Sequence, residues 1–329
     1  MRWAWIAAVL FVAGTAHGRP GAPGDPNASE FWREVIEPHG AEVASIVAKA
    51  KTAIARAGEA EDDEDDAIAR RTHHLGDAYG MLRYARKLSP DNPEVLRLLG
   101  ITADELGKTH QALDALETCV RIQGPERAGV EVTGRLGMID LRLGKLDDAI
   151  RWLGYVQSPL SDTDNAVALV DLATALAARG DMARAIDTLA NTVPPQMSYL
   201  SDPLTLVSFA LAVHYDRDEQ RAAAVEVLDH MQGALQLELG PRTQHVLAAM
   251  RFAPAEDAYY YHALLYEALG DFTEARAEWA LYAQVPGAPW RRRALDHVAA
   301  IDAARAAPAP RARRTVPSGP SRPSPPVPR

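Results

Sequence analysis

The segment NPEVLRLLGITADELGKTHQALDALETCVRI, residues 92–122, predicts two helices joined by a tight turn. Asn92 can accept hydrogen bonds from the first free N–H groups of a helix, and Pro93 suits a first helical turn because its missing N–H leaves no bond unmade there. Leu106-Gly107 interrupts the apolar periodicity and supplies the turn. This segment therefore indicates a helix–turn–helix unit.

The apolar residues of this unit recur at helical spacing, with small residues where the two helices would cross closely. The arrangement resembles the tetratricopeptide repeat, a 34-residue helix–turn–helix whose pattern is Trp-x2-Leu-Gly-x2-Tyr, then Ala-x3-Phe, then Pro. The slots of that pattern are filled here by Leu96, Leu99, Gly100, Ala103, Ala112 and Leu116.

The same pattern returns along the chain at near-constant spacing. The turn positions are 73, 107, 144, 180, 219 and 270, which gives intervals of 34, 37, 36, 39 and 51 residues. Four copies are clear, whereas those at 73 and 219 are degenerate, and Asp218-Glu219 replaces the turn glycine in the second of these. The recurrence predicts an all-α fold, and the resemblance implies a right-handed α-solenoid of about six repeats over residues 66–286.

Three regions depart from the repeat. The long last interval predicts an insertion near residues 234–255, which contains Gly240-Pro241. Residues 19–65 are expected to form a linker and capping helices, and the acidic run at 59–66 indicates a solvated loop or helix start, or else an ion or basic-partner site. Residues 287–306 predict a C-terminal capping helix, because a solenoid without caps would expose apolar faces. The apolar positions of that helix are Leu295, Val298 and Ile301.

The first eighteen residues have the layout of a secretory signal peptide. Arg2 gives a positive start, residues 3–13 are apolar, and small residues precede a cleavage site after Gly18. The alternative is a transmembrane anchor, but residues 3–16 fall short of the ~20 that a bilayer core needs. The sequence therefore predicts an exported chain, periplasmic or secreted, with a soluble mature form that has no membrane span.

Cys119 is the only cysteine, so the chain cannot form an internal disulfide. It occupies a slot of the repeat that takes a small, packed residue. That position favours a buried, inert thiol over a redox or intermolecular role.

Charge is distributed unevenly along the chain. Residues 303–329 hold six arginines and no acid, and Arg2 adds another positive charge, so the net charge of −9 leaves −16 on the rest. An acidic body disfavours nucleic acid as a partner. The Pro/Arg-rich tail, residues 307–329, is predicted to be disordered and to act either as a basic spacer in weak contact with an anionic envelope surface or as a ligand for an SH3-type groove. The groove motif would be Arg322, Pro325 and Pro328.

The familiar catalytic and metal-binding motifs are missing from the sequence. Residues 106–109 end like a phosphate-binding loop, but Thr102 stands where that loop needs a glycine. His73 and His74 would point about 100° apart on a helix, and the other histidines are scattered. There is also no nucleophile elbow and no zinc-protease motif. These observations predict a protein that is not an enzyme and that uses no cofactor and no metal.

Stacked tetratricopeptide repeats usually hold a peptide or helix in a concave groove lined by their first helices, so the resemblance implies candidate binding residues. Tyr260 is the most suggestive, because tyrosine offers a large contact area at low entropic cost. Family clamps for a C-terminal carboxylate use Lys and Asn, whereas these slots hold Arg97 and Ile101 here, so such a clamp is not expected. The groove candidates are Glu94, Arg97, Ile101, Asp104, Met138, Leu141, Val213, Asp216, Asp257, Tyr260, Leu264 and Glu267.

The sequence thus predicts an exported protein–protein interaction scaffold or assembly factor of the cell envelope, whose protein or peptide partner it does not identify. One alternative is an accessory subunit of an envelope enzyme system, or a hydrolase with a site around the 234–255 insertion. Another is a purely structural homo-oligomer. A pocket beside the insertion with convergent carboxylates would favour the enzymatic alternative, and a continuous open groove would favour the scaffold.

Overall fold

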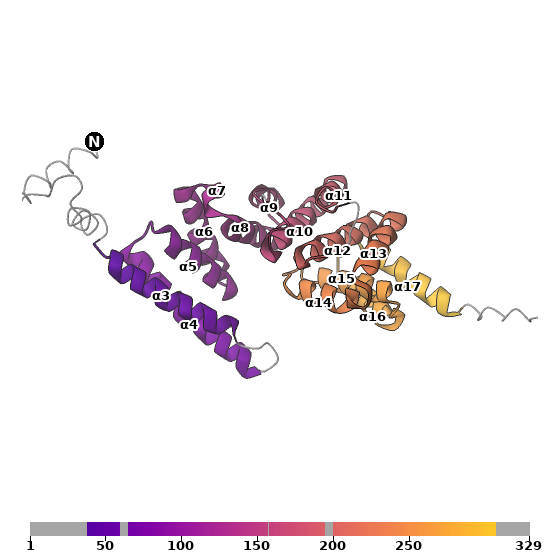
Figure 1. The fold of residues 1–329 in the computed structure, drawn as a ribbon, viewed down its shortest axis with the longest axis horizontal. Helices are drawn as coiled ribbons and strands as arrows, with labels where there is room; N and C mark the ends of the chain where they lie inside the picture. The colour runs from indigo at the N-terminus through magenta and orange to yellow at the C-terminus, as the bar shows by residue number, and fades with distance from the viewer. Residues whose placement is uncertain (1–37, 60–64, 157, 195–199, 307–329) are drawn as a thin grey trace, which may run out of the picture. The chain divides into compact units, whose positions relative to one another are not determined.

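The computed structural model describes residues 38–59, 65–156, 158–194 and 200–306. Every regular element within these residues is a helix, and most helices that follow one another along the chain pack together (Figure 1). The predicted all-α helical repeat fold is therefore confirmed. The contacts divide the chain into two compact units, an N-terminal unit that ends at Thr188 and a C-terminal unit that begins at Leu189.

The N-terminal unit consists mainly of helix pairs. Its helices are α3 (Gly40–Gly58), α4 (Asp65–Leu88), α5 (Pro93–Glu105), α6 (Thr109–Gln123), α7 (Pro125–Ala128), α8 (Val130–Arg142), α9 (Leu146–Leu153), α10 (Thr163–Ala178) and most of α11 (Met182–Ala190). The helices of the C-terminal unit are α12 (Asp202–Arg217), α13 (Arg221–Leu235), the short 3-10 helix η2 (Gln236–Glu238), α14 (Leu239–Ala248), α15 (Asp257–Leu269), α16 (Phe272–Gln284) and α17 (Arg291–Ala306).

The turns inside the helix pairs share one geometry. Gly107 has a φ of 69°, and the N–H of the next residue, Lys108, donates to the carbonyl of Ala103 at 2.8 Å. This is the closing bond of a Schellman turn, which needs a residue with positive φ and favours glycine there. Glu219 adopts the same turn with a φ of 60°, so the degenerate copy keeps the geometry without the glycine. The positive φ and the bond recur at Gly144, Gly180 and Gly270, which confirms these predicted turn positions.

Small residues bring the helices of a pair into close contact. A Cβ added to Gly100 would lie less than 3.0 Å from the side chain of Leu116, and one added to Gly137 would meet Leu153 equally closely. The same crossing therefore occurs in two successive pairs, α5–α6 and α8–α9. The predicted core slots of the first pair are buried, namely Leu96, Leu99, Gly100, Ala103, Ala112, Leu116 and Cys119.

Replacing Gly137 with Ala is expected to lower the free energy of unfolding by about 1–3 kcal/mol, because the new methyl group overpacks against Leu153. Gly134 is a matched control on the same helix, since its added Cβ would meet Ala168 at an ordinary 3.4 Å. Gly134→Ala should be neutral or stabilise by up to about 1 kcal/mol. Urea unfolding of the two variants measures the difference, and equal destabilisation would show that the crossing is not tight.

The first helix pair differs from the prediction. The turn expected near His73 is wrong, because α4 runs unbroken from Asp65 to Leu88 and pairs with α3 (Figure 1). No glycine or proline stands at position 73, and the segment is rich in residues that favour helix. The predicted N-terminal cap, α3, is therefore one partner of the first pair, and it buries Val43, Val47 and Ala50.

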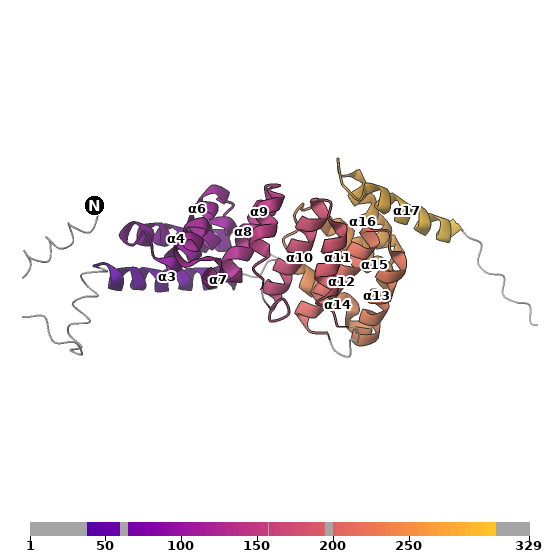
Figure 2. The same cartoon turned by 90° about the horizontal axis from the view of Figure 1, so that it is seen from above.

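The insertion in the C-terminal unit forms a helix of its own. Residues 236–248 form η2 and α14, and α14 packs against α12 and α15. The helices α15 and α16 lie side by side, followed by α17 (Figure 1 and Figure 2). The predicted C-terminal helix is present as α17, but Leu295 is 49% exposed, so this part of the expected apolar face is wrong. The residues of α17 that are buried are Ala294, His297 and Ile301.

None of the helices in the described ranges combines the length and the apolar character needed to cross a membrane. The predicted signal peptide at residues 1–18 and the tail at residues 307–329, with Arg322, Pro325 and Pro328, lie outside these ranges.

Candidate functional site

A buried carboxylate joins three helices of the C-terminal unit. Asp216, in the last turn of α12, is 2% exposed. It accepts hydrogen bonds from the Tyr260 hydroxyl of α15 at 2.7 Å, from the His297 Nε2 of α17 at 3.0 Å, and from the Arg293 guanidinium of α17. Burial alone raises the pKa of Asp216, but the bonds from His297 and Arg293 outweigh it and hold the pKa well below its usual range. Asp216 is therefore ionised and positions α17 against α12 and α15.

His297 lies between two carboxylates. Its Nε2 bonds to Asp216, and its Nδ1 bonds to Glu267 at 2.8 Å, while the indole N–H of Trp279 donates to the same Glu267 oxygen at 3.0 Å. The imidazole also stacks on the Trp279 ring, with centroids 4.3 Å apart. Burial lowers the pKa of His297, but the bonds to Asp216 and Glu267 outweigh it and raise the pKa to about 8. The ring is thus an imidazolium that donates to a carboxylate on each side.

A buried ion pair lies next to this cluster. Arg217 and Asp257 form an ion pair at 2.9 Å, and both are 4% exposed. The Arg217 guanidinium lies 4.7 Å from the centre of the Tyr260 ring. Burial and the charge of Asp216 raise the pKa of Tyr260 well above its usual value, so its hydroxyl stays protonated and donates to Asp216. Charged and aromatic side chains of α15 therefore hold the C-terminal end of α12 in place.

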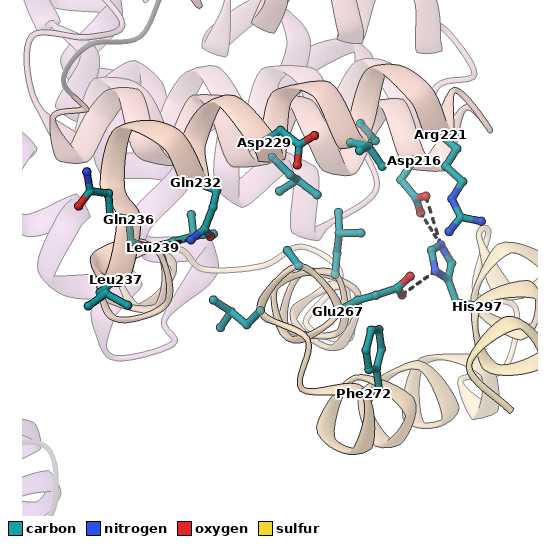
Figure 3. Close-up of a pocket in the computed structure, with 16 residues that line it drawn as sticks. Asp216, Arg221, Asp229, Gln232, Gln236, Leu237, Leu239, Glu267, Phe272 and His297 are labelled. Carbon is teal, nitrogen blue, oxygen red and sulfur yellow. Dashed lines mark hydrogen bonds and ion pairs between the residues drawn. The ribbon is translucent and has the colours of Figure 1, made fainter. Parts of the chain in front are cut away.

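A pocket opens beside this cluster, between α13 and α15. Its volume is about 560 Å³, and Asp216, Glu267 and His297 lie at one end of it (Figure 3). Its walls are mostly apolar, whereas polar side chains of α13 stand along its edge. The apolar lining residues are Ala224, Val225, Leu228, Leu237, Leu239, Leu264, Ala268, Leu269 and Phe272, and the other polar ones are Arg221, Asp229, Gln232 and Gln236.

The insertion contributes directly to the pocket. Gln236, Leu237 and Leu239, which belong to η2 and the start of α14, line it together with α13 and α15 (Figure 3). In this unit α14 packs against both α12 and α15, the first helices of the pairs on either side of the insertion. Residues of the irregular interval therefore form part of the pocket wall.

The chemistry of the cluster fits a structural clamp better than a catalytic centre. Both nitrogens of His297 donate to carboxylates, so the protonated ring has no lone pair with which to act as a base. Asp216 is already saturated by Tyr260, Arg293 and His297. Among the described residues, no group of three or more His, Cys, Asp and Glu side chains is arranged to hold a metal ion.

The predicted groove residues of the C-terminal unit divide into two groups. Asp216, Leu264 and Glu267 line the pocket, whereas Val213 is 0% exposed and lies in the core. Tyr260 is 0% exposed, so the prediction that it contacts a ligand directly is wrong, because its ring packs edge-on against Trp279 and Tyr282 and its hydroxyl is taken by Asp216. Asp257 is buried in its pair with Arg217. Neither residue belongs to the pocket lining, although Tyr260 donates a hydrogen bond to Asp216, which does.

The candidates of the N-terminal unit pair with neighbouring helices. Glu94 forms an ion pair with Lys51 at 2.6 Å, and Arg97 forms one with Glu131. Asp104 is 6% exposed and accepts hydrogen bonds from two arginines of α8. Ile101 is partly buried, whereas Met138 and Leu141 are buried in α8. No described pocket brings these candidates together as a lining, and they stay predictions as ligand contacts.

Sequence reasoning missed His297 and Arg293. The scattered histidines gave no metal-ligand spacing, so His297 carried no functional signal. A signal was nevertheless present, because residues 294, 297 and 301 are spaced as one face of a helix and only the middle one is polar. A polar residue in a buried stripe predicts a hydrogen-bonded partner on a neighbouring element.

The raised pKa of His297 predicts that stability depends on pH. Its folded pKa of about 8 lies above the unfolded value of 6.5, so its contribution is fully present below pH 6.5 and is lost as the pH rises through 8. Between pH 6 and pH 9, we expect the unfolding free energy of the wild type to fall by about 2 kcal/mol more than that of the His297→Gln variant. Urea unfolding at both values tests this, with the exposed His230→Gln as control. Parallel pH profiles for wild type and His297→Gln would contradict the assignment.

Residues 257–284, which form α15 and α16, match the family model of the tetratricopeptide repeat. The match covers the pair in which the sequence pattern is most complete, from Tyr259 to Tyr282. No curated protein sequence matches the chain. The family model supports the resemblance and does not confirm the number of repeats.

Proposed function

Taking the chain as a tetratricopeptide repeat protein, we propose that it is a protein–protein interaction module that holds a partner segment in the pocket between α13 and α15. The repeat is the general ground for this proposal, because such repeats act mainly as protein-binding scaffolds. The location of the binding site is inferred from the pocket, which is lined largely by apolar residues and is formed in part by α15 of the matched repeat.

The observation that carries the proposal is the exposure of large apolar side chains around this pocket. Leu237 is 96% exposed, Phe272 is 48% exposed and Val225 is 45% exposed, and all three line the pocket. Exposed apolar side chains cost free energy in water, and a group of them around one pocket with a polar border is typical of an interaction site.

The shape of the pocket favours an amphipathic partner helix. Arg221, Val225, Leu228, Gln232 and Gln236 recur at three- and four-residue spacing along α13 and its end, so one face of this helix lines the pocket. A partner helix lying along this face could bury its own apolar stripe against the walls and bond its polar flank to Arg221 and Gln232. The charged residues Asp216 and His297 would mark the end of the pocket, beyond which the apolar stripe of the partner helix would not extend.

The enzymatic alternative is weaker, although the structure partly meets its criterion, a pocket beside the insertion with convergent carboxylates. The pocket does lie beside the insertion, and two carboxylates, Asp216 and Glu267, do converge at one end. Both carboxylates are nevertheless held by His297. Burial raises the pKa of each, but the hydrogen bonds and the charge of His297 outweigh burial, so both pKa values are lowered. A hydrolase needs one group poised to give or take a proton near neutral pH, and neither carboxylate meets that need. His297 has a pKa of about 8, but both of its nitrogens are bonded to carboxylates, so neither is directed at a substrate.

We also propose that the chain is exported and acts as a scaffold or assembly factor of the cell envelope. The layout of residues 1–18 supports this, as does the burial of its single thiol, Cys119, which leaves little for an oxidising compartment to attack. Cell fractionation combined with N-terminal sequencing tests it. A mature protein that begins at Arg19 in the envelope fraction is expected, and a cytoplasmic protein that keeps Met1 would overturn it.

Affinity capture with paired variants tests the pocket. We expect Leu237→Glu and Phe272→Glu to reduce recovery of the specific partners by at least about tenfold, because each places a charge in an apolar contact. Leu295→Glu is the matched control, since Leu295 is as exposed as Phe272 but does not line the pocket. Quantitative mass spectrometry of the captured proteins gives the measurement, with circular dichroism confirming that each variant is folded. Recovery of the same partners by all three variants would show that the pocket does not bind them.

A further inference from the structure

A second pocket lies in the N-terminal unit, and its lining is basic. It has a volume of about 320 Å³ and is lined by one stripe of α4, together with Leu99 of α5 and Gln111 of α6. The stripe of α4 consists of Tyr79, Arg83, Arg86 and Lys87, at positions i, i+4, i+7 and i+8. We call this pocket the Tyr79 groove. None of the sequence-predicted groove candidates lines it.

Two cations lie near the Tyr79 ring, Arg83 of the groove lining and Lys108, which is not part of the lining. The Arg83 guanidinium lies 5.7 Å from the centre of the Tyr79 ring, and the Lys108 ammonium lies 5.4 Å from it. Arg83, Lys87 and Lys108 are exposed, so their charged ends are available to a ligand. Contact with the ring limits the freedom of Arg83 and Lys108, which reduces the entropy lost when they bind an anion.

No acidic side chain belongs to the lining of the Tyr79 groove, all of which lies within the described residues. A carboxylate stands at its edge, where Asp114 pairs with Arg86 at 2.6 Å. Several cations thus lie together in a chain whose net charge is −9. Grouping like charges costs free energy in the unbound protein, and an anionic ligand removes that cost.

The groove fits a polypeptide better than other anions. Lysine and arginine side chains lie here next to the apolar side chains of Tyr79, Pro90 and Leu99. This combination suits a segment of Glu and Asp residues, whose carboxylates can pair with the cations while their CH2 groups contact the apolar side chains. Two cations already lie against the Tyr79 ring, which leaves it poorly placed to stack on a nucleic acid base. The concave lining and small volume also differ from the broad basic face that a membrane surface would need.

We propose that the Tyr79 groove binds an acidic segment of a partner protein, with Arg83, Lys87 and Lys108 binding its carboxylates. This site lies within the N-terminal unit and does not depend on the pocket between α13 and α15. The chain would then engage two different kinds of partner surface, an acidic segment in one unit and an apolar helix in the other.

Fluorescence anisotropy with the full chain tests the proposal. The probe is a fluorescein-labelled peptide of eight alternating Glu and Asp residues, and the matched peptide has Gln and Asn instead. We expect the acidic peptide to bind and the neutral one not to, and we expect Arg83→Glu combined with Lys108→Glu to weaken binding by at least about tenfold. Arg127→Glu, an exposed charge reversal on α7, and Leu237→Glu, in the other unit, should each stay within about twofold of wild type.

Several results would overturn the assignment of the Tyr79 groove. Equal binding of the neutral peptide, or an equal loss in Arg127→Glu, would do so, because recognition would then not involve the groove charges. Tighter binding of a single-stranded oligonucleotide or of phosphatidylglycerol vesicles, lost in the same double variant, would assign the groove to a different ligand. Loss of peptide binding in Leu237→Glu alone would place the acidic segment in the other pocket. Circular dichroism melting of the double variant distinguishes lost binding from unfolding.

Discussion

Replacing Asp216 with Ala is expected to lower the free energy of unfolding of the C-terminal unit by about 3–5 kcal/mol, because it leaves buried cations without their shared partner. Arg293 and His297 both bond to this carboxylate, and Tyr260 loses its acceptor at the same time. Since Arg293 and His297 both belong to α17, the helix should also detach more readily from the rest of the unit. Urea unfolding gives the free energy, and hydrogen exchange of residues 291–306 reports the detachment.

Asp229→Ala is the control for this prediction. Asp229 is an exposed carboxylate of the same pocket, so its loss should change stability by no more than about 0.5 kcal/mol. If Asp216→Ala unfolded like wild type and α17 kept its protection from exchange, the cluster would not be what holds α17 in place.

Trp279→Ala is expected to cost about 3–5 kcal/mol, because it removes the largest fully buried side chain of the matched repeat. Trp279 fills the large apolar slot of the second helix, packs edge-on against Tyr260, stacks on His297, and donates a hydrogen bond to Glu267. Trp279→Phe should cost less, because it keeps most of the packing and loses mainly the hydrogen bond.

Thermal or urea unfolding measures both Trp279 variants, with Phe272→Ala as the control. Phe272 begins the same helix and is 48% exposed, so its truncation should cost under about 1 kcal/mol. A Trp279→Ala protein as stable as Phe272→Ala would mean that the slot is not the packed centre that the repeat pattern predicts.

Local signals in the sequence predicted most of the fold. A turn such as Leu106-Gly107 needs a particular backbone conformation, and glycine supplies it, so the turn positions could be read from single residues. The close crossing of the two helices of a pair needs a small residue opposite a large one, as at Gly100 and Leu116, and both residues belong to the same repeat. Both features are decided within about 34 residues and could therefore be predicted without the tertiary structure.

The candidate site could not be predicted in the same way. Asp216 and His297 are 81 residues apart, and their contact depends on how α12, α15 and α17 pack. Tyr260 was predicted to face a ligand because tyrosine is common at interfaces, but the same hydroxyl serves equally well as a buried donor to Asp216. The pocket depends on where α14 packs, and the sequence showed only that residues were inserted there.

Site-specific photocrosslinking in intact cells, with a benzophenone amino acid placed at 237, 272 or 295, tests the role of the pocket between α13 and α15 most directly. We expect the first two positions to crosslink to the same short segment of one partner protein, because Leu237 and Phe272 line one pocket. Position 295, which is as exposed as Phe272 but does not line the pocket, should not crosslink to that segment. Adducts from position 295 that match those from the pocket, or no adduct from either pocket position, would show that this pocket does not bind a partner segment.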